Sequence, residues 1–524
     1  MLSPSSLVSF SSPRNLFLLV VGILSTLLVA FTRWRRRSQN LPPSPRGSLP
    51  LIGHAHQMPS VRPWVWSYNL SRELDSDIVY LNLAGQKTVV INDYDTAVDL
   101  INKRSSVYSS RPHLVLAGDY LSTGKRIIFL PYGTTWRNHR AAVHQEMVPS
   151  KLQQYHHIQA AEVKLLMQRL LLSPSSFQEH FRQYSGNVIL KIAYGLNSDD
   201  KRTEKAALME TLLAMANPGK LVDAFPFLDW LPDILAPWRA DALRHQAHNQ
   251  HFYRGLLHET LAKVDSGLLT SDQTFVSRLW QDREKLGMDE LDVAYLAGSM
   301  FEGGMETTAS TLTIFVMAMV THPEVFRAIQ EEVTNVCGDQ PPIMENFEAL
   351  PYVRAACKEV LRWRIIVPMG FPHQMSTDQD DTFRGYVIPA GSVIIANQYG
   401  MAMSDKTFGQ TYNPLKFEPR RWLELPGGIN DITEGHPAFG FTRRVCPGNR
   451  LAVNSLFLVI AHLGYYFNIE AAEGAPTVDT SVEGFTTGHN IEPNPFECKI
   501  VPRVGREADI EAQADAAREA LGGL

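Results

Sequence analysis

A long apolar segment near the middle of the chain limits what this sequence can fold into. Residues 289–320 have helical periodicity and are apolar almost throughout, but acidic, glycine and threonine residues interrupt the centre. Charges at the centre of an apolar helix argue against a membrane span, because burying a charge in lipid is expensive. We therefore expect a core helix that crosses a large globular protein. The interrupting residues are Glu302, Gly303, Gly304, Glu306, Thr307 and Thr308.

The paired glycines in this helix need a physical reason, since each weakens a helix by about 1 kcal/mol relative to alanine. Gly303 and Gly304 have no side chains, and a nearby threonine can bond the carbonyl four residues earlier. Together they predict a local groove that a small ligand could occupy. A tolerated kink without any chemistry is the alternative interpretation.

The second informative stretch is residues 439–448 (FGFTRRVCPG), in which Cys446 follows two arginines and precedes a helical apolar run. A thiolate at a helix N-terminus and beside arginine is stabilised by the helix dipole and by the positive charge. Haem iron is the main protein metal that a single cysteine satisfies. The stretch therefore predicts a thiolate ligand, with a buried, inert cysteine as the alternative.

The composition argues against several functional classes. Of the 524 residues, 44% are hydrophobic and 20% are charged, which is ordinary for a globular protein with a large core. A formal charge of −5 and scattered basic residues argue against a nucleic-acid partner. Widely spaced cysteines indicate neither a zinc site nor a disulfide framework, so a reducing compartment fits. These cysteines are Cys337, Cys357, Cys446 and Cys498.

The N-terminal residues predict a membrane anchor. Residues 16–34 are mostly apolar, and arginines cluster at and beyond their C-terminal end. At 1.5 Å per residue this segment is close to the roughly 30 Å needed to span the bilayer core. A cleaved signal peptide is the rival interpretation, but the positive cluster follows the apolar run instead of preceding it. The positive-inside rule then places residues 1–15 in the lumen, and the proline-rich residues 35–48 form a stiff hinge to a cytosolic body.

Helical periodicity dominates residues 150–320, whereas the expected strands are short and few. Residues 79–91 alternate and carry β-branched side chains, which predicts a hairpin. Two more short strands are expected at residues 386–388 and 393–397. The expected class is mainly α, in an α+β pattern with a small β-sheet segregated in the sequence.

Three further motifs, taken with the cysteine loop, resemble the cytochrome P450 family. Residues 358–362 (KEVLR) place a glutamate and an arginine three apart on one helix face. Residues 417–422 (FEPRRW) form an arginine-bearing turn, and residues 303–308 (GGMETT) are the interrupted centre of the long helix. The four motifs occur in the family's order, which makes the resemblance far more specific than any one of them.

The resemblance covers residues 42–504 and implies a cytochrome P450-like helical fold, preceded by the transmembrane helix. It implies a haem-thiolate monooxygenase domain at residues 49–505. Residues 362–373 are most similar to fungal P450s of specialised metabolism. The acidic, alanine-rich tail at residues 506–524 is expected to be a solvated helix or a frayed end.

The resemblance also implies roles for individual residues. Cys446 would be the axial ligand of haem b (iron protoporphyrin IX), and Thr307 and Glu306 would stabilise bound O2 and relay protons to it. A buried structural lock, in which removing one partner strands a charge, would support the haem pocket. The lock would consist of Glu359, Arg362 and Arg421, and the other cofactor-binding residues would be Arg444, Trp136, Arg140, Phe439 and Gly448.

Trp136 and Arg140 lie one helical turn apart on one face, a pattern that an amphipathic surface helix would also show. The resemblance implies instead that both reach a haem propionate, for which the guanidinium fork is suited. Thr442 departs from the family's pattern, which usually has glycine four residues before the cysteine. Because a β-branched residue tolerates positive φ badly, either Gly440 re-forms the bulge or haem is held less well.

Residues 301–307, 366–370 and 484–487 match the family's substrate-contacting regions. They offer almost no charge with which to hold an ionised ligand, and burying an unpaired charge is costly. The resemblance therefore implies an apolar substrate, namely a terpenoid, a polyketide or a neutral alkaloid. Simple core packing is the alternative, more plausible for Ile366 than for Phe485. The expected pocket side chains are Phe301, Ile366, Val367, Met369 and Phe485.

The implied activity is O2-dependent oxidation at the endoplasmic reticulum membrane. Electrons would come from NADPH through a separate cytochrome P450 reductase, because the chain has no nucleotide-binding motif of its own. Arg443 and Arg137 are candidates for docking an acidic reductase surface. Two alternatives remain, a haem-thiolate isomerase or dehydratase without external electrons and a membrane-tethered haem carrier without turnover. The intact Glu306–Thr307 pair argues against the first.

Overall fold

The computed structural model describes residues 40–196, 221–425 and 427–522, together with the isolated positions 17, 21, 22, 25 and 26. The predicted luminal segment and most of the predicted anchor lie outside these residues. Within the described part of the chain, no single helix is long and apolar enough to cross a membrane. Of the predicted hinge, the described residues are fixed to the body, since Pro43 O accepts a hydrogen bond from Tyr80 N at 2.9 Å.

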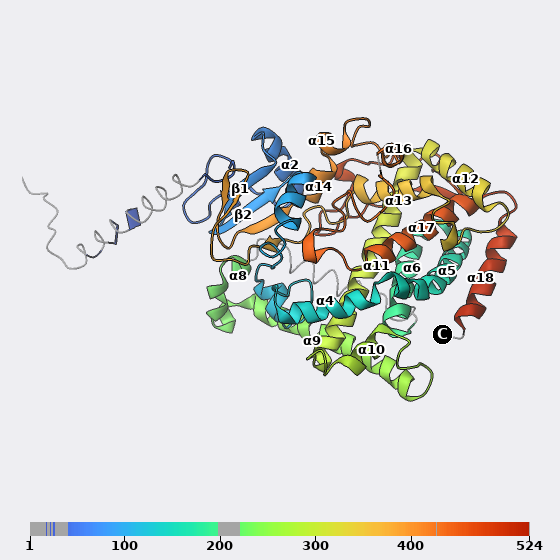
Figure 1. Ribbon diagram of the computed structural model, residues 1–524, viewed down its shortest axis with the longest axis horizontal. Coiled ribbons are helices and arrows are strands. Elements are labelled where there is room, and N and C mark those ends of the chain that lie inside the picture. Colours follow the sequence, from blue (N-terminus) through green and yellow to red (C-terminus); the bar gives the residue numbers. More distant parts are fainter. Residues whose placement is uncertain are drawn as a thin grey trace, which may run out of the picture.

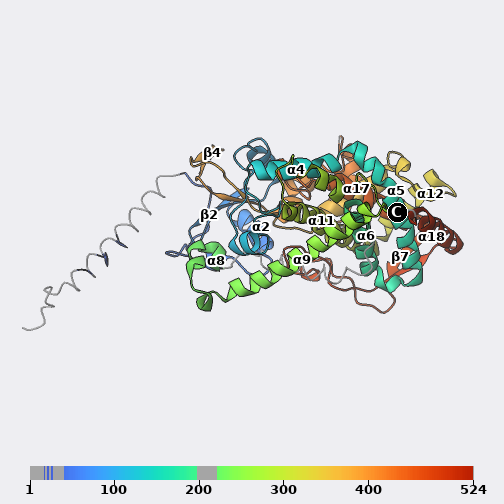
Figure 2. The same ribbon diagram turned by 90° about the horizontal axis from the view of Figure 1, so that it is seen from below.

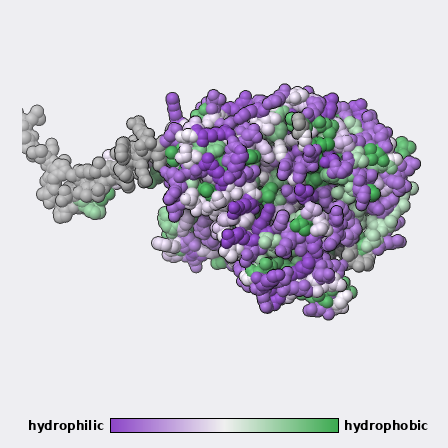
Figure 3. Space-filling model, viewed as in Figure 1, coloured by the Kyte–Doolittle hydropathy of each residue, from purple (hydrophilic) through white to green (hydrophobic). Residues whose placement is uncertain are grey.

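The architecture is mostly helical with small sheets, as predicted. Strands β1 (Ile78–Leu83) and β2 (Gln86–Ile91) and helix α2 (Pro63–Glu73) gather at one end of the molecule. Helices α5 (Pro149–Leu172) and α12 (Pro323–Cys337) lie at the opposite end (Figures 1 and 2). The outer surface is largely hydrophilic in the view of Figure 3, with apolar residues in scattered groups.

The main sheet has the strand order β1-β2-β6-β3 and joins distant parts of the chain. The predicted hairpin is confirmed as β1 paired with β2, which in turn pairs in parallel with β6 (Val393–Ala396). The expectation that the sheet is segregated in the sequence is therefore wrong, because about 300 residues separate its two halves. Two smaller antiparallel pairs complete the strands. The remaining strands are β3 (His373–Gln374), β4 (Asp381–Phe383), β5 (Tyr386–Ile388), β7 (Phe467–Ala471) and β8 (Cys498–Pro502).

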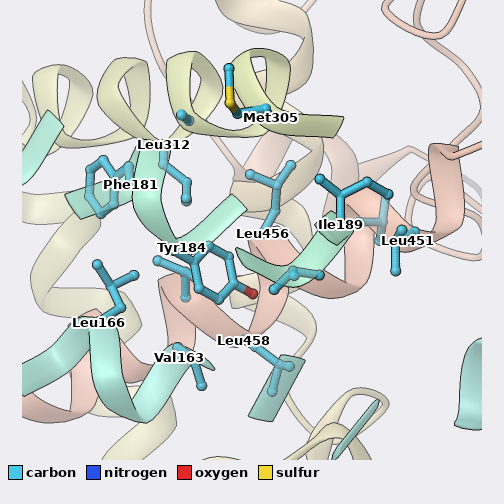
Figure 4. Packing of buried hydrophobic residues seen from close by; sticks show 14 of the residues in the cluster. Val163, Leu166, Phe181, Tyr184, Ile189, Met305, Leu312, Leu451, Leu456 and Leu458 are labelled. Carbon is cyan, nitrogen blue, oxygen red and sulfur yellow. The ribbon is translucent and has the colours of Figure 1, made fainter. Parts of the chain in front are cut away.

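The predicted core helix is confirmed as α11 (Glu290–Thr321). It begins with a reciprocal pair of hydrogen bonds between Asp289 and Asp292, and residues 308–319 are all buried. A helix that is apolar all round is stable only when other elements surround it. Figure 4 shows this core, where side chains from α5, α6 (Phe177–Tyr194), α11 and α17 (Asn449–Tyr466) interlock.

The other helices are mostly short and surround this core. The α-helices are α3 (Tyr94–Ala97), α4 (Thr134–Glu146), α8 (Leu221–Ala224), α9 (Pro237–Asp265), α10 (Phe275–Asp282), α13 (Pro351–Trp363), α14 (Gln398–Ala402), α15 (Asp405–Phe408), α16 (Arg420–Glu424) and α18 (Glu507–Leu521). The shorter 3-10 and π turns are η1 (Ala55–Gln57), η2 (Val98–Asn102), η3 (Val115–Tyr120), η4 (Pro174–Ser176), η5 (Pro226–Trp230), η6 (Asp233–Leu235), η7 (Met344–Asn346), η8 (Thr442–Arg444) and η9 (Val482–Gly484).

The C-terminal tail forms α18, which packs along α5 at the end of the molecule away from the main sheet (Figure 1). Ile510, Ala514 and Ala517 form its buried stripe, and four of its five acidic residues are exposed. The fifth, Asp509, accepts a hydrogen bond from Tyr466 OH at 3.0 Å. A frayed end is therefore not what the structure shows. The tail is a helix with one solvated face and one packed face.

Candidate active site

The cysteine loop is closed by the main chain. Cys446 N–H donates to Phe439 O at 2.8 Å, and the single turn η8 lies between the two residues. Helix α17 begins at Asn449 with Gly448 at its N-cap position. The cysteine therefore precedes a helix, as predicted, and it remains partly exposed.

Opposing effects act on the Cys446 thiol. Burial raises its pKa, whereas the backbone N–H of Gly448 and the charge of Arg140 favour the thiolate and lower the pKa. The predicted help from an arginine is thus present, and helix α4 supplies it. A bound metal cation would outweigh the burial, because a coordinating thiol is deprotonated outright.

Thr442 stands where the family usually has glycine, four residues before the cysteine. It adopts the left-handed conformation itself, with φ of +59°. Two hydrogen bonds hold it there. Its N–H donates to Asn102 Oδ1 at 2.6 Å, and its Oγ1 lies 2.7 Å from Ser109 Oγ. Gly440 also has positive φ, so it accompanies Thr442 instead of replacing it.

Trp136 of α4 contacts the cysteine loop, and the charge of Arg140 of the same helix lowers the pKa of Cys446. The Arg444 guanidinium lies 4.3 Å above the Trp136 ring and donates to Ser109 O and Leu130 O, each at 2.7 Å. Trp136 is buried beneath the guanidinium of Arg444. The structure therefore brings together the predicted residues of the helix and the loop.

A buried cluster of positive charge surrounds this contact. Burial lowers the pKa of Arg444, and Arg111 and Arg140 lower it further. Burial also lowers the pKa of Arg111 to about 9, and it lowers that of His373 well below its usual range. Within the described residues no carboxylate pairs with any of the three arginines. Since arginine keeps its charge in proteins, the cluster calls for an anion. Arg111 contacts the carbonyls of Ile128, Phe371 and Pro372.

The centre of α11 faces open space at Gly303 and packs closely against α6 at Gly304. Thr307 Oγ1 donates to Gly303 O at 2.7 Å, the predicted bond to the carbonyl four residues earlier. Gly303 is exposed, and a Cβ placed on it would meet nothing within 4 Å. A Cβ on Gly304 would instead lie 3.0 Å from the side chain of Ile189 in α6. Only the first glycine opens the groove, whereas the second allows two helices to pack closely.

Glu306 is held away from the Thr307 hydroxyl by an ion pair. Its Oε2 lies 3.3 Å from Arg182 Nε, and the same guanidinium lies 2.6 Å from Glu492 Oε2. Burial raises the pKa of Glu306, and Arg182 partly opposes that shift. Glu306 and Thr307 are therefore neighbours in the chain that are not hydrogen-bonded to each other in this structure.

The predicted lock is present and completely buried. Glu359 accepts hydrogen bonds from Arg362 at 2.7 and 3.0 Å, and Arg421 Nε lies 3.5 Å away. Trp422 Nε1 adds a hydrogen bond of 2.9 Å, and Glu418 N adds one of 3.1 Å. A buried carboxylate needs such a set of donors, and Trp422 is a member that the sequence did not indicate.

The model of the cytochrome P450 family matches residues 42–493 of this chain. The chain belongs to the cytochrome P450 family. This P450 is similar over nearly its whole length to fungal monooxygenases. It is 32% identical to a cytochrome P450 monooxygenase of Armillaria gallica, covering 96% of each chain. It is 32% identical to tryptamine 4-monooxygenase of Psilocybe cyanescens, covering 93% of this chain and 98% of that one.

A solved structure of a zebra fish cytochrome P450 with abiraterone has the same fold. Its TM-score against this P450 is 0.68 at 22% identity, and the match covers 84% of this chain and all of that one. The family and the fold imply haem b and a reductase that supplies electrons from NADPH. This P450 is therefore an oxidoreductase of the monooxygenase type.

The residues present fit haem b. Cys446 would supply the thiolate ligand, and the arginine cluster would supply the positive charge that two propionates require. Arg111 and His373 join Arg444, Arg140 and Trp136 in this cluster. The signal that could have found Arg111 is weak, because it stands in an ordinary SSRPH stretch. Its position becomes informative only once the fold brings it beside Arg444.

Four of the five predicted substrate-pocket residues belong to the main apolar core cluster or pack against it. Phe301 and Phe485 are buried in the main core cluster, and Ile366 and Met369 pack against it while remaining partly exposed. Ile366 O accepts a hydrogen bond from Ile491 N at 2.8 Å, and Thr486 N donates to Glu492 O at 2.9 Å. The residues that follow the third predicted stretch therefore link it to the second. The expected ranking is reversed, since Phe485 is more buried than Ile366. Val367 is partly exposed and lies outside this cluster.

Proposed function

We propose that this P450 inserts one oxygen atom of O2 into an apolar intermediate of specialised metabolism, namely a terpenoid, a polyketide or an alkaloid. The second oxygen atom leaves as water, with two electrons and two protons. The observation that carries the proposal is the open groove at Gly303 and Thr307, on the same helix as Phe301 of the apolar cluster. A relative named for oxidising tryptamine supports a small metabolite with an aromatic ring as the substrate.

When bound, haem supplies the iron at which O2 is activated, and the chain's own residues bind, orient and move protons. The Thr307 hydroxyl can turn from Gly303 O to donate into the space above that glycine. Glu306 is suited to hold and release a proton because burial raises its pKa. To reach the groove, Glu306 must first leave Arg182.

We place the enzyme at the endoplasmic reticulum membrane, with residues 16–34 as its anchor and the catalytic body in the cytosol. Large apolar side chains near α8 support this placement, since Trp230 is 90% exposed and Ile234 is 89% exposed. Both views show α8 beside β2, at the end of the molecule nearest to the predicted hinge (Figures 1 and 2). Exposed apolar groups of this kind mark membrane or partner surfaces.

The test is made on the full-length protein in two stages. A CO spectrum after reduction with dithionite should show the thiolate-type band of a cysteine-ligated haem. With added reductase, NADPH consumption should then depend on an apolar substrate, and an oxygenated product should form. Product formation without NADPH would indicate an isomerase or dehydratase, and the absence of any product across a panel of apolar metabolites would contradict the proposed substrate class.

A further inference from the structure

One arginine of α6 is shared by three carboxylates beside the groove. Arg182 Nε lies 3.3 Å from Oε2 of Glu306, in α11. Its Nη2 lies 2.6 Å from Glu492 Oε2, and its Nη1 lies 3.9 Å from Glu179 Oε2. The shortest of the three contacts is therefore made with Glu492, which lies between η9 and β8, and not with the acid next to the groove.

The electrostatics of this cluster follow the same order. Burial lowers the pKa of Arg182 and the carboxylates raise it, Glu492 more than Glu306. Burial raises the pKa of Glu306 and Arg182 lowers it, whereas Glu492 and then Glu179 raise it further. Among the described residues these three are the main charged groups that act on Glu306. A guanidinium that already has one carboxylate partner stabilises the charge of a second one less.

The main chain around the cluster is held by hydrogen bonds. Glu492 N donates to Thr486 Oγ1 at 3.1 Å, and Thr486 N donates to Glu492 O at 2.9 Å. This pair joins the glutamate to the third predicted substrate-contacting stretch, residues 484–487. Ser185 Oγ donates to Met305 O at 2.5 Å, which joins α6 to α11 one residue before the acid of the groove. A change of partner at the shared guanidinium therefore requires only side-chain rotation.

We propose that Glu492 is a positioning residue for proton supply, because it occupies Arg182 and thereby leaves Glu306 able to turn toward the groove. There Glu306 releases one proton to the Thr307 hydroxyl, which gives up its own proton into the space above Gly303. The Glu306 carboxylate then regains a proton from solvent, and the guanidinium keeps its charge throughout. The proposal rests on the proposed monooxygenase function and adds to it a residue from the loop of the predicted substrate contacts.

Glu492→Gln tests this role, because it removes the charge that occupies Arg182 and keeps the size of the side chain. Arg182 then pairs more fully with Glu306, and a carboxylate that raised the pKa of Glu306 is gone. Both effects lower the pKa of Glu306, so fewer of these carboxyl groups carry a proton at a given pH. Glu179→Gln is the matched control, because it removes a carboxylate from the same guanidinium at the longer distance of 3.9 Å.

Two measurements on the full-length holoprotein report the effect. The first is the product formed per NADPH consumed, followed across pH with added reductase. Glu492→Gln should lower this ratio by about threefold near neutral pH and move its pH profile to lower pH, since losing a nearby like charge changes the protonated fraction by that order. The second needs no turnover. The infrared band of protonated carboxyl groups, assigned by its loss in Glu306→Gln, should titrate at lower pH in Glu492→Gln.

Glu179→Gln should match the unmodified protein in both measurements, and dithionite should give the same CO spectrum in every variant. A double-mutant cycle then separates competition for Arg182 from a direct effect of charge. Arg182→Gln should move the infrared titration of Glu306 to higher pH, and Glu492→Gln should have a clearly smaller effect in that background. An effect of Glu492→Gln that is equally large without the guanidinium would overturn the proposal.

Two further outcomes would also overturn it, namely an unchanged pH profile or infrared titration in Glu492→Gln and an equal shift in Glu179→Gln. If Glu492→Gln does not bind haem, Glu492→Asp decides, because its shorter side chain lengthens the 2.6 Å contact and should move both readouts in the same direction. Absence of the thiolate-type band in the unmodified protein would instead overturn the proposed function, and this proposal with it.

Discussion

Replacing Trp422 with phenylalanine tests how strongly the buried lock depends on its indole donor. The Glu359 carboxylate has no access to solvent, and Trp422 Nε1 donates to it at 2.9 Å. Trp363 offers a matched comparison, because its Nε1 donates at 2.7 Å to a neutral acceptor, the backbone carbonyl of Leu415. The two tryptophans are 2% and 1% exposed.

The two substitutions remove the same atoms from similar surroundings. Each ring also lies close to a cation, Lys358 at 4.6 Å from Trp422 and Arg364 at 4.3 Å from Trp363. A hydrogen bond to a charged group contributes about 1.5–3 kcal/mol, against about 0.5–1.5 kcal/mol for a neutral one. Trp422→Phe should therefore lower the free energy of unfolding by about 1–1.5 kcal/mol more than Trp363→Phe does.

The assay is urea unfolding of the detergent-solubilised, haem-loaded full-length chain, followed by circular dichroism at 222 nm. If bond length alone set the strength of the hydrogen bond, Trp363→Phe would cause the larger loss of stability, because the Trp363 bond is the shorter one. An equal or larger loss in Trp363→Phe would refute the reasoning that the charge of Glu359 makes the Trp422 bond stronger. The CO spectrum of each folded variant reports whether the haem pocket is retained.

Four further predictions concern other parts of the site. Cys446→Ser should abolish the thiolate-type CO spectrum, and an unchanged spectrum would remove the basis of the assignment. Thr307→Ala should leave NADPH consumption while product falls and peroxide rises, and unchanged coupling would place the proton path elsewhere. Val367→Phe should alter substrate affinity or the oxidised position with the spectrum preserved, and identical products would contradict its place in the pocket. Burial lowers the pKa of Lys358 to about 8 from 10.5, so between these values the unfolded chain binds more protons and stability rises with pH. Lys358→Met should reduce the rise of the urea midpoint with pH between these values. If the midpoint rises equally with pH in the variant and in the unmodified protein, this prediction is wrong.

Features with a local signal could be predicted from the sequence. The periodicity of residues 289–320 indicated α11, and the three-residue spacing of Glu359 and Arg362 indicated one side of the lock. The alternation of apolar and polar residues in the segment 79–91 indicated the β1–β2 hairpin. Each of these follows from neighbours within one helical turn or one strand pair.

Features that depend on distant partners left no pattern. Arg111 donates to carbonyls about 260 positions away, and a carbonyl is present on every residue, so nothing in the sequence marks it. Gly303 and Gly304 look alike in the sequence but face open space and Ile189 respectively. The prediction for Thr442 was based on the poor tolerance of a β-branched residue for positive φ. It could not include the hydrogen bond to Ser109, which offsets this backbone strain.

The bonds that hold Thr442 and Arg444 also set when the cofactor site can exist during synthesis. Thr442 and Ser109 are 333 positions apart in the chain. Ribosomes add about 5–20 residues per second, so Ser109 is made roughly 20 to 70 s before its partner. During that interval the nascent chain contains Asn102 and Arg111 but lacks the cysteine loop, whose residues Thr442 and Arg444 they interact with. We therefore expect haem capture through Cys446 only at the end of translation or later, and chains that stop before residue 439 should remain haem-free however well their helices fold.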